Sequence, residues 1–354
     1  MKELQKLIEQ GAETGAYSCA AYEIGTSAGS LARGYAGRLG IGRGEASQET
    51  LYDLASVTKP IVAVGFMRLL EQGRICLDDT VDRFLPAYRG YPKGSVSMYA
   101  LLTHTSTVHG QVQLYHTCHS KEDMLLAVRS MPPRSLTPLS VEYSSQGFML
   151  IGEAVAAAAG MPLDQALATL VLEPLEMRNT CFNPPEALHA RIASTEDCPW
   201  RGRMVVGQVH DENAVVMGGV AGHAGLFSDT QDLAKLCRAM LTGLAPDGAR
   251  FLQPATLALM TRCHTAGLNL ARGLGWQMKD PQGSPAGDLF SAASFGHTGF
   301  TGTSLWMDPT RDLYAVLLTN RVHPSRESNE IQHIRHVFHN LSALYADACA
   351  RKAR

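Results

Sequence analysis

The sequence predicts an α/β fold plus an all-α part, in which an antiparallel sheet is flanked by terminal helices and carries an inserted helical domain. Alternating, strand-like patterns occur near both ends of the chain, and helical patterns fill most of the sequence between about residues 79 and 180. A sheet assembled from both ends leaves the helical stretch as an insertion. We therefore expect a discontinuous α/β domain (residues 1–78 and 200–354) and a mainly helical domain (residues 79–199).

The N-terminal part begins with an amphipathic helical pattern, MKELQKLIEQG. Residues 16–36 then alternate in the manner of two strands, with a loose turn at residues 25–29. The run SVTKPIVAVGFMRLLEQG predicts a helix that begins at Ser56 and stops at Gly73. Pro60 fits this helix because a residue in the first turn needs no N–H for the helical hydrogen bonds.

The rest of the chain follows the same two patterns. Predicted helical segments between residues 79 and 180 include LLTHTS, Met124–Arg129, Gly147–Ala159 and Leu163–Leu170. A Pro-rich, charged region around Pro184-Pro185 and Pro199 predicts long loops. The remaining predicted elements are a helix at Asp229–Thr242, strands at Ser304–Met307 and Leu313–Thr319, and an amphipathic helix from about Ser328 to Ala350.

Composition excludes several classes of partner. The 354 residues carry a net charge of −2, and the only basic run is the short tail Arg351-Lys352-Ala353-Arg354, so we expect no nucleic-acid partner. No segment is apolar enough for a membrane span or a signal peptide, so we expect no membrane partner and, unless a signal was removed, a cytoplasmic location. Eight cysteines without a C-x-x-C pair favour reduced thiols.

The tetrad Ser56-Val57-Thr58-Lys59 is the strongest candidate for chemistry. A serine and a lysine three residues apart lie on one face of a helix, so the amine can take the proton of the hydroxyl. Free N–H groups at a helix N-terminus also favour a developing oxyanion. Chance can place S-x-x-K in any helix, so the tetrad alone does not separate a nucleophile from an ordinary helix residue.

Two further motifs follow in order. Tyr143-Ser144-Ser145 begins a helical segment, and His297-Thr298-Gly299 leads into the C-terminal pair of strands. Taken singly, Tyr143 suits a half-buried helix residue and His297 a loop histidine. Together with SVTK and the phrases LLTHTS, AGLFS and DLAKL, they make residues 15 to 340 resemble the serine β-lactamase and penicillin-recognising enzyme superfamily, within its class C branch of DD-peptidases and family VIII esterases.

The resemblance implies a role for each matching residue. Ser56 would be the acylated nucleophile, with Lys59 as the base that activates it. Tyr143 would carry protons, as base in one step and as acid toward the leaving group in another. The backbone N–H groups of Ser56 and Phe300 would form the oxyanion hole. No cofactor and no metal is expected.

Substrate would lie along the edge strand His297-Thr298-Gly299, and here the chain departs from the pattern. Ser145 stands where the branch usually has asparagine, so contact with a substrate amide or the positioning of Lys59 is expected to be weaker. His297 stands where lactamases usually have lysine and is mostly neutral at pH 7. The missing cation argues against a dedicated penicillinase, whereas some DD-peptidases of the group use HTG.

Three other motifs have alternative interpretations. Asp211, in the loop phrase HDEN, is a candidate to contact a substrate amine or amide, although an exposed polar loop explains it too. GGVAGHAG lacks the G-K-[ST] ending of a phosphate loop and suits a tight turn. The histidines and cysteine between His104 and His119 match no standard zinc spacing. His104 is expected to tie a turn, and whether His109 to His119 line the substrate entrance stays open.

The predicted function is a metal-independent serine hydrolase that acts through an acyl-enzyme on a small ester, amide or peptide. The order of preference is a carboxylesterase or an amidase on cell-wall-derived peptides, then a DD-peptidase, then a weak β-lactamase. The alternative is a non-catalytic penicillin-binding, peptide-binding or regulatory protein on the same fold. Retention of Ser56, Lys59 and Tyr143 together favours the enzyme.

Overall fold

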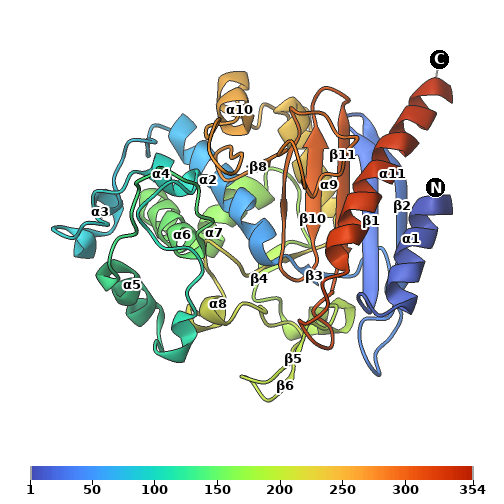
Figure 1. Cartoon of the computed structure of the whole chain (residues 1–354), viewed down its shortest axis with the longest axis horizontal. Coiled ribbons are helices and arrows are strands. Elements are labelled where there is room, and N and C mark those ends of the chain that lie inside the picture. The colour runs from blue at the N-terminus through green and yellow to red at the C-terminus, as the bar shows by residue number, and fades with distance from the viewer. Residues whose placement is uncertain (1, 353–354) are drawn as a thin grey trace.

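A six-stranded antiparallel sheet, assembled from both ends of the chain, organises the molecule (Figure 1). The computed structural model describes residues 2–352. The strand order is β2-β1-β11-β10-β9-β8, so the N-terminal hairpin pairs directly with the C-terminal strands, as predicted. The strands are β1 Cys19–Thr26, β2 Gly29–Gly37, β8 Gln277–Met278, β9 Phe295–Thr298, β10 Ser304–Asp308 and β11 Leu313–Thr319.

Helices cover both faces of this sheet. The terminal helices α1 (Lys2–Glu13) and α11 (Ile331–Lys352) lie side by side on one face and enclose an apolar core with β1, β10 and β11 (Figure 1). Helix α9 (Thr230–Thr242) packs on the opposite face against the same three strands. Because both faces are covered, β11 is buried along its whole length and reads as the continuous apolar run LYAVLLT.

The helical part packs beside the sheet and shares its larger core. Its elements are α2 Thr58–Glu71, α3 Val81–Phe84, α4 Met98–Leu102, α5 Lys121–Ser130, α6 Ser145–Ala159 and α7 Leu163–Leu167. The last of these continues as a π-helix over Ala168–Leu172, which accounts for the predicted helix at Leu163–Leu170. One buried cluster includes residues from α2, α6, α9 and β11, so the predicted division at residues 79 and 199 crosses a continuous core and stays a prediction.

Two small sheets lie between these parts. One has the order β3-β7-β4, with β3 Tyr52–Asp53, β7 Leu226–Ser228 and β4 Cys181–Phe182. The other pairs β5 Asp197–Cys198 with β6 Arg203–Met204. Most of the predicted loop region around residues 184–199 is irregular, apart from a 3-10 helix at Glu186–Arg191. The first small sheet matters for function because β3 ends two residues before Ala55 and three before Ser56.

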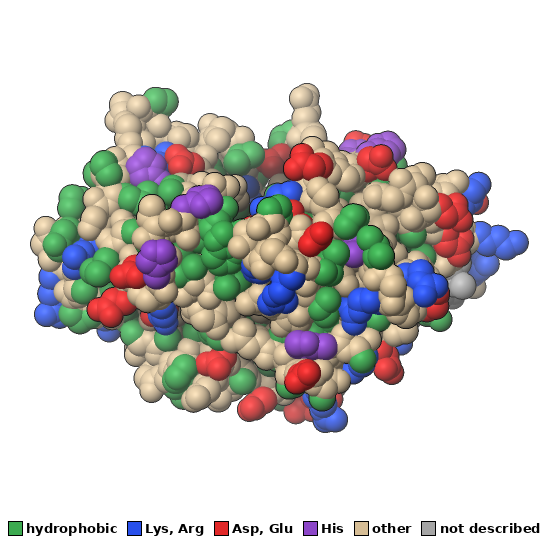
Figure 2. Space-filling model, turned by 90° about the horizontal axis from the view of Figure 1, so that it is seen from below, with side chains coloured by type: hydrophobic (Ala, Val, Ile, Leu, Met, Phe, Trp, Pro, Cys, Tyr) green, Lys and Arg blue, Asp and Glu red, His purple; other side chains and the backbone are tan. Residues whose placement is uncertain are grey.

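The two α-helices not yet named are α8 Glu212–Val216 and α10 Pro254–Thr261. Within residues 2–352, no single helix has the length and apolar composition to cross a membrane; α6 and the helical segment that follows it would meet that test only as a pair bent by 75°. All eight cysteines are free thiols. Figure 2 shows basic and acidic side chains interspersed over the visible face, in keeping with the small net charge.

Candidate active site

Ser56 lies in a 3-10 turn, Ala55–Val57, that leads into α2 at Thr58. The predicted helix therefore exists, but its α-helical part begins two residues after Ser56. Ala55 has a φ of 46°, in the left-handed region that a residue with a Cβ rarely adopts. The buried carboxylate of Asp53 accepts the Ala55 N–H at 2.8 Å and holds this turn. Such strained backbone is common where a side chain must be aimed at a substrate.

Lys59 is fully buried, and its amine lies against the serine. Nζ is 3.0 Å from Ser56 Oγ and donates to the carbonyl oxygen of His223 at 3.0 Å. The carbonyl occupies one N–H bond of the amine, which leaves the uncharged form a lone pair for the serine proton. This geometry matches the predicted pairing of nucleophile and base. No hydrogen bond joins Ser145 to Lys59 in the described residues, so His223 supplies the anchor.

Tyr143 immediately precedes α6 and brings its phenol to the same place. The Lys59 ammonium is 4.8 Å from its ring centroid, and the guanidinium of Arg272 is 5.8 Å from it. The rings of His104 and His297 lie 4.9 and 6.0 Å away. Two cations beside the ring stabilise negative charge that develops on the phenol oxygen during proton transfer.

His104 holds the segment that carries Tyr143. It adopts a φ of 59°, its carbonyl accepts the Glu142 N–H, and its Nδ1 accepts the Ser144 N–H at 3.1 Å. Ser144 in turn caps α6 by accepting the Gly147 N–H at 2.8 Å. Burial, with Arg272, Lys59 and His297 nearby, holds the pKa of His104 well below its usual value, which suits a neutral acceptor. The predicted role of His104 in a turn is confirmed.

Strand β9 ends at Thr298, and the turn after it approaches the nucleophile. The short strand β8 pairs with β9 only at Phe295 and Gly296, so His297 and Thr298 lie on an open edge of the sheet. Gly299 leaves no room for a side chain, because a Cβ there would lie 2.1 Å from Thr303 Oγ1 and 2.4 Å from the Leu54 carbonyl oxygen. Thr303 Oγ1 donates to that same carbonyl at 2.9 Å, which ties the turn to the segment before Ser56. Among residues 2–352, neither the Ser56 N–H nor the Phe300 N–H has an acceptor within the protein, as an empty oxyanion hole requires.

His297 is a neutral imidazole at this edge. Burial, with the charges of Lys59 and Arg272, lowers its pKa to about 3. Its Nδ1 donates to the Thr298 carbonyl at 2.8 Å, because a carbonyl oxygen can only accept, so Nε2 carries the lone pair. Nε2 is buried without a partner.

Ser56 opens on two cavities, which share Gln111 and Phe300. The first, of about 370 Å³, is here called the cationic cavity because Arg272, Arg321 and Arg335 line it and no acidic residue does. His297, Thr298 and Gly299 also face this cavity, together with Tyr143, Gln277, Asn329, Ile331 and Gln332. The sequence predicts no fixed cation for a substrate carboxylate at His297, and the structure places three arginines from outside the three motifs in the cavity beside Ser56.

The three arginines differ in their bonding. Arg335 donates to the carbonyl oxygens of Gly299 and Thr303, and Arg321 donates to the carbonyl oxygen of Phe300. Both arginines therefore hold the turn that follows β9. Arg272 is 7% exposed, its Nε is buried without an acceptor, and no hydrogen bond or ion pair of its guanidinium is found among the described residues. Apart from the face of the Tyr143 ring, this buried cation therefore has no partner, which is costly unless a ligand supplies one.

The second cavity, of about 250 Å³, is here called the acidic cavity. The phrase His210-Asp211-Glu212-Asn213 lines it together with Ala55, Val112, Gln113, Tyr115, Ser145, Ala224 and Arg326. Ser145 and Asp211 therefore line the acidic cavity and not the cavity that contains Arg272, Arg321 and Arg335. Among the described residues, His109, His116 and His119 line neither cavity.

Asp211 is fixed within the acidic cavity. Its Oδ1 accepts the Ala214 N–H at 2.8 Å and the His223 Nε2–H at 3.0 Å. Burial opposes its ionisation, but His223, the backbone N–H and Lys59 outweigh that effect and hold the pKa of Asp211 below its usual value. The sequence predicts only a tight turn at His223. In the structure its ring bonds Asp211 and its carbonyl oxygen bonds Lys59, so it connects the two. A histidine among the four glycines of residues 218–225 was the signal available in the sequence.

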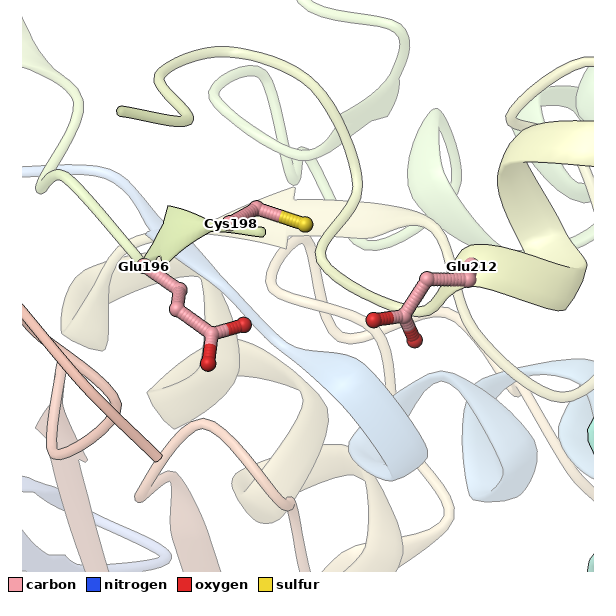
Figure 3. A group of neighbouring side chains, drawn as sticks. All are labelled: Glu196, Cys198 and Glu212. Carbon is pink, nitrogen blue, oxygen red and sulfur yellow. The ribbon is translucent and has the colours of Figure 1, made fainter. Parts of the chain in front are cut away.

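One group of side chains has the composition of a metal site. Figure 3 shows the carboxyl groups of Glu196 and Glu212 turned toward the same space, with Cys198 nearby. Arg326 already bonds both carboxylates, at 2.7 Å to Glu196 Oε1 and 2.5 Å to Glu212 Oε1. Burial opposes ionisation of Glu196, but its bonds to His210 and Arg326 lower its pKa to about 2. The guanidinium of Arg326 thus lies where a metal ion would bind these carboxylates.

Comparisons with known proteins agree with this fold. Residues 4–337 match the family described as Beta-lactamase. The "Putative D-alanyl-D-alanine carboxypeptidase" proteins of Salmonella schwarzengrund and Salmonella typhimurium are each 32% identical over 309 residues, covering 78% of this chain and 71% of theirs. The fold and these relatives define a serine hydrolase that acts through an acyl-enzyme. The chain belongs to the beta-lactamase family.

Solved structures confirm the predicted architecture. "EstCE1, a hydrolase with promiscuous acyltransferase activity" has a TM-score of 0.76 at 23% identity, covering 95% of this chain and 98% of that one. A penicillin-binding protein homologue from Caulobacter crescentus gives 0.76 at 19% identity, with 96% and 97% covered. A class C beta-lactamase from Rhodobacter sphaeroides gives 0.74 at 18% identity, with 97% and 99% covered.

Proposed function

We propose that this enzyme cleaves amides or esters whose leaving group carries a carboxylate, as in the C-terminal residue of a short peptide. The observation that carries this proposal is the buried guanidinium of Arg272, which lines the cationic cavity beside Ser56 and has no partner in the described residues. The printed name of the Salmonella relatives, a carboxypeptidase, points the same way. A carboxypeptidase-type activity therefore moves ahead of the simple carboxylesterase predicted from the sequence.

The chemistry follows from the positions of three side chains. Ser56 Oγ attacks the substrate carbonyl carbon while the uncharged Lys59 Nζ, 3.0 Å away, takes its proton. The carbonyl oxygen becomes an oxyanion that the N–H groups of Ser56 and Phe300 receive. Removing one such donor typically lowers kcat by about 10²- to 10³-fold, which gives the scale of this contribution.

Collapse of the tetrahedral intermediate needs an acid for the leaving group. The Tyr143 hydroxyl is placed to protonate the leaving nitrogen or oxygen, and the C–N or C–O bond then breaks to leave the acyl group on Ser56. In the second half, a water molecule gives a proton to the Tyr143 phenolate and attacks the ester carbon. Ser56 leaves with a proton returned by the Lys59 ammonium. Both proton carriers are thereby regenerated.

The carboxylate of the leaving group would pair with Arg272. A guanidinium binds a carboxylate through two parallel N–H bonds, which fixes the orientation of the leaving group as well as its charge. The neutral His297 is suited to line the cavity beside this pair as an acceptor. Lys59 bonds Ser56 and His223, so it does not also need to bind the substrate carboxylate.

A matched pair of substrates tests this proposal. An N-acylated dipeptide with a free C-terminal carboxylate is compared with the same peptide as its C-terminal amide, and kcat/KM is measured for each. We expect the carboxylate form to be preferred by about ten- to a hundredfold in the wild-type enzyme and by little in Arg272→Gln. Equal rates for both forms in the wild-type enzyme would refute the proposed leaving group.

The non-catalytic alternative is decided by covalent labelling. A fluorophosphonate probe or labelled penicillin should add its mass at Ser56, and the adduct should be absent in Ser56→Ala. Turnover of any ester by the wild-type protein, lost in this variant, supports the enzyme. Labelling without turnover would favour a penicillin-binding protein, and no labelling by any acylating probe would favour a binding or regulatory protein.

A further inference from the structure

The acidic cavity is the part of the site that the proposed chemistry does not use. At the carbon attacked by Ser56, the acyl group and the leaving group lie on different sides of the nucleophile. If the leaving group occupies the cationic cavity, the acyl group faces the acidic cavity, because Ser56, Gln111 and Phe300 border both. A volume of about 250 Å³ suits a group of one or two residues and is below the usual range of pockets for larger ligands.

The charges in this cavity are unbalanced. Two carboxylates, Asp211 and Glu212, and one guanidinium, Arg326, line it. Arg326 pairs with Glu212 and also with Glu196, a buried residue that does not line the cavity. Among the described residues, Asp211 forms no ion pair with a lysine or an arginine, so it is the carboxylate of the cavity that Arg326 leaves unpaired.

Asp211 presents part of its charge to the cavity. Its Oδ1 is held by the Ala214 N–H and by His223, whereas Oδ2 has no partner in residues 2–352. The side chain is 35% exposed, although Lys59 and His223 behind it are buried. One oxygen is therefore fixed while the other is left without a partner in a side chain that lines the cavity beside Ser56, which is a preorganised arrangement for a donor that carries positive charge.

We propose that the acidic cavity binds an ammonium group on the acyl side of the substrate, with Asp211 as its main partner. The inference rests on the proposed function, since it assumes that the leaving group lies in the cationic cavity. It narrows the substrate class to short peptides, or aminoacyl esters, that carry a free amine near the scissile carbonyl and a carboxylate beyond it. The two ends of such a substrate match the opposite charges of the two cavities.

Four forms of one peptide test the binding of the amine separately from the binding of the carboxylate. The amine is either free or acetylated, and the carboxylate is either free or amidated, and kcat/KM is measured for all four. We expect the free amine to be preferred by about ten- to a hundredfold, the scale of a charge-assisted hydrogen bond. Asp211→Asn should abolish this preference and keep the carboxylate preference, whereas Arg272→Gln should do the opposite.

Asn keeps the oxygen that caps α8, so Asp211→Asn should fold. Asp78→Asn removes an exposed carboxylate that lines neither cavity and is the matched control, with both preferences unchanged. An amine preference that persists in Asp211→Asn, or no preference in the wild-type enzyme, would overturn the inference and leave the carboxylate preference standing. Loss of the carboxylate preference alone would refute only the proposed leaving group.

Binding decides the matter without turnover. In Ser56→Ala, titration calorimetry compares the free-amine and acetylated peptides at pH 7, where an α-amino group with a pKa near 8 is charged. The free-amine peptide should bind about tenfold tighter or more, and the difference should shrink above pH 9. Equal Kd values at pH 7 would overturn the inference whether or not the wild-type enzyme turns the peptides over.

Discussion

Gly299→Ala probes the contact between the edge-strand turn and the nucleophile. The added methyl would lie 2.4 Å from the Leu54 carbonyl oxygen and 2.1 Å from Thr303 Oγ1, and the first of these is backbone that cannot rotate away. The methyl would also break the hydrogen bond that Thr303 makes to Leu54. Overpacking costs about 1–3 kcal/mol and a buried carbonyl left without its donor a further ~1–3 kcal/mol. We therefore expect a loss of about 2–6 kcal/mol in the free energy of unfolding.

The loss of activity should exceed what the loss of stability explains. If the turn moves away from Ser56 by about 1 Å, the Phe300 N–H no longer reaches the oxyanion, and kcat should fall by about 10²- to 10³-fold with a smaller change in KM. Urea unfolding and steady-state kinetics at 20 °C measure the two effects separately. Gly44→Ala is the control, because its Cβ would meet nothing within 4 Å. A folded Gly299→Ala enzyme with kcat within threefold of wild type would refute the assignment of the oxyanion hole.

Two further predictions concern a proton carrier and acid stability. Tyr143→Phe should slow cleavage of alkyl esters by about 10²- to 10⁴-fold but p-nitrophenyl esters far less, because a nitrophenolate leaves without an acid; equal losses in kcat for both would contradict the assignment. Burial lowers the pKa of His339 to about 3, so between that value and about pH 6.5 the unfolded chain binds a proton that the folded chain does not, and stability falls as pH falls. His339→Asn should reduce the difference in unfolding free energy between pH 7 and pH 5 by about 2 kcal/mol, measured by urea titration, and an unchanged difference would show that His339 is not buried as a neutral group.

Local patterns explain why the fold could be predicted and why Ser56, Lys59 and Tyr143 could be expected to lie together. The run LYAVLLT has the length and composition of a buried strand, and β11 has the predicted bounds, Leu313–Thr319. Ser56, Lys59 and Tyr143 lie in short motifs whose order along the chain is itself informative. The structure brings all three together, because α2 packs against α6 and the 3-10 turn that carries Ser56 contacts both α2 and β9.

The 3-10 turn at Ser56 and the contacts around Lys59 could not be predicted in the same way. The turn depends on the Asp53 carboxylate, which takes the Ala55 N–H, and on Thr303, which reaches Leu54 from a distant loop. The His223 carbonyl that holds Lys59 comes from a segment far away in sequence. Neither periodicity nor composition reports which loops meet across a cavity. The cytoplasmic location likewise stays a prediction.

Positive charge has two functions in this site, which are to bind a substrate carboxylate and to support proton transfer by the phenol. The two functions rest largely on different residues and can change independently. Where a lysine stands at the position of His297, one residue can serve both substrate binding and the field around the phenol. Here His297 is neutral, and the charge comes from Arg272, on a loop outside all three motifs. Arg272 still lies 5.8 Å from the Tyr143 ring centroid, so it can bias proton transfer as well as bind a carboxylate. Replacing it should therefore alter selectivity strongly and the chemical step weakly, because Lys59 remains beside Ser56 and Tyr143.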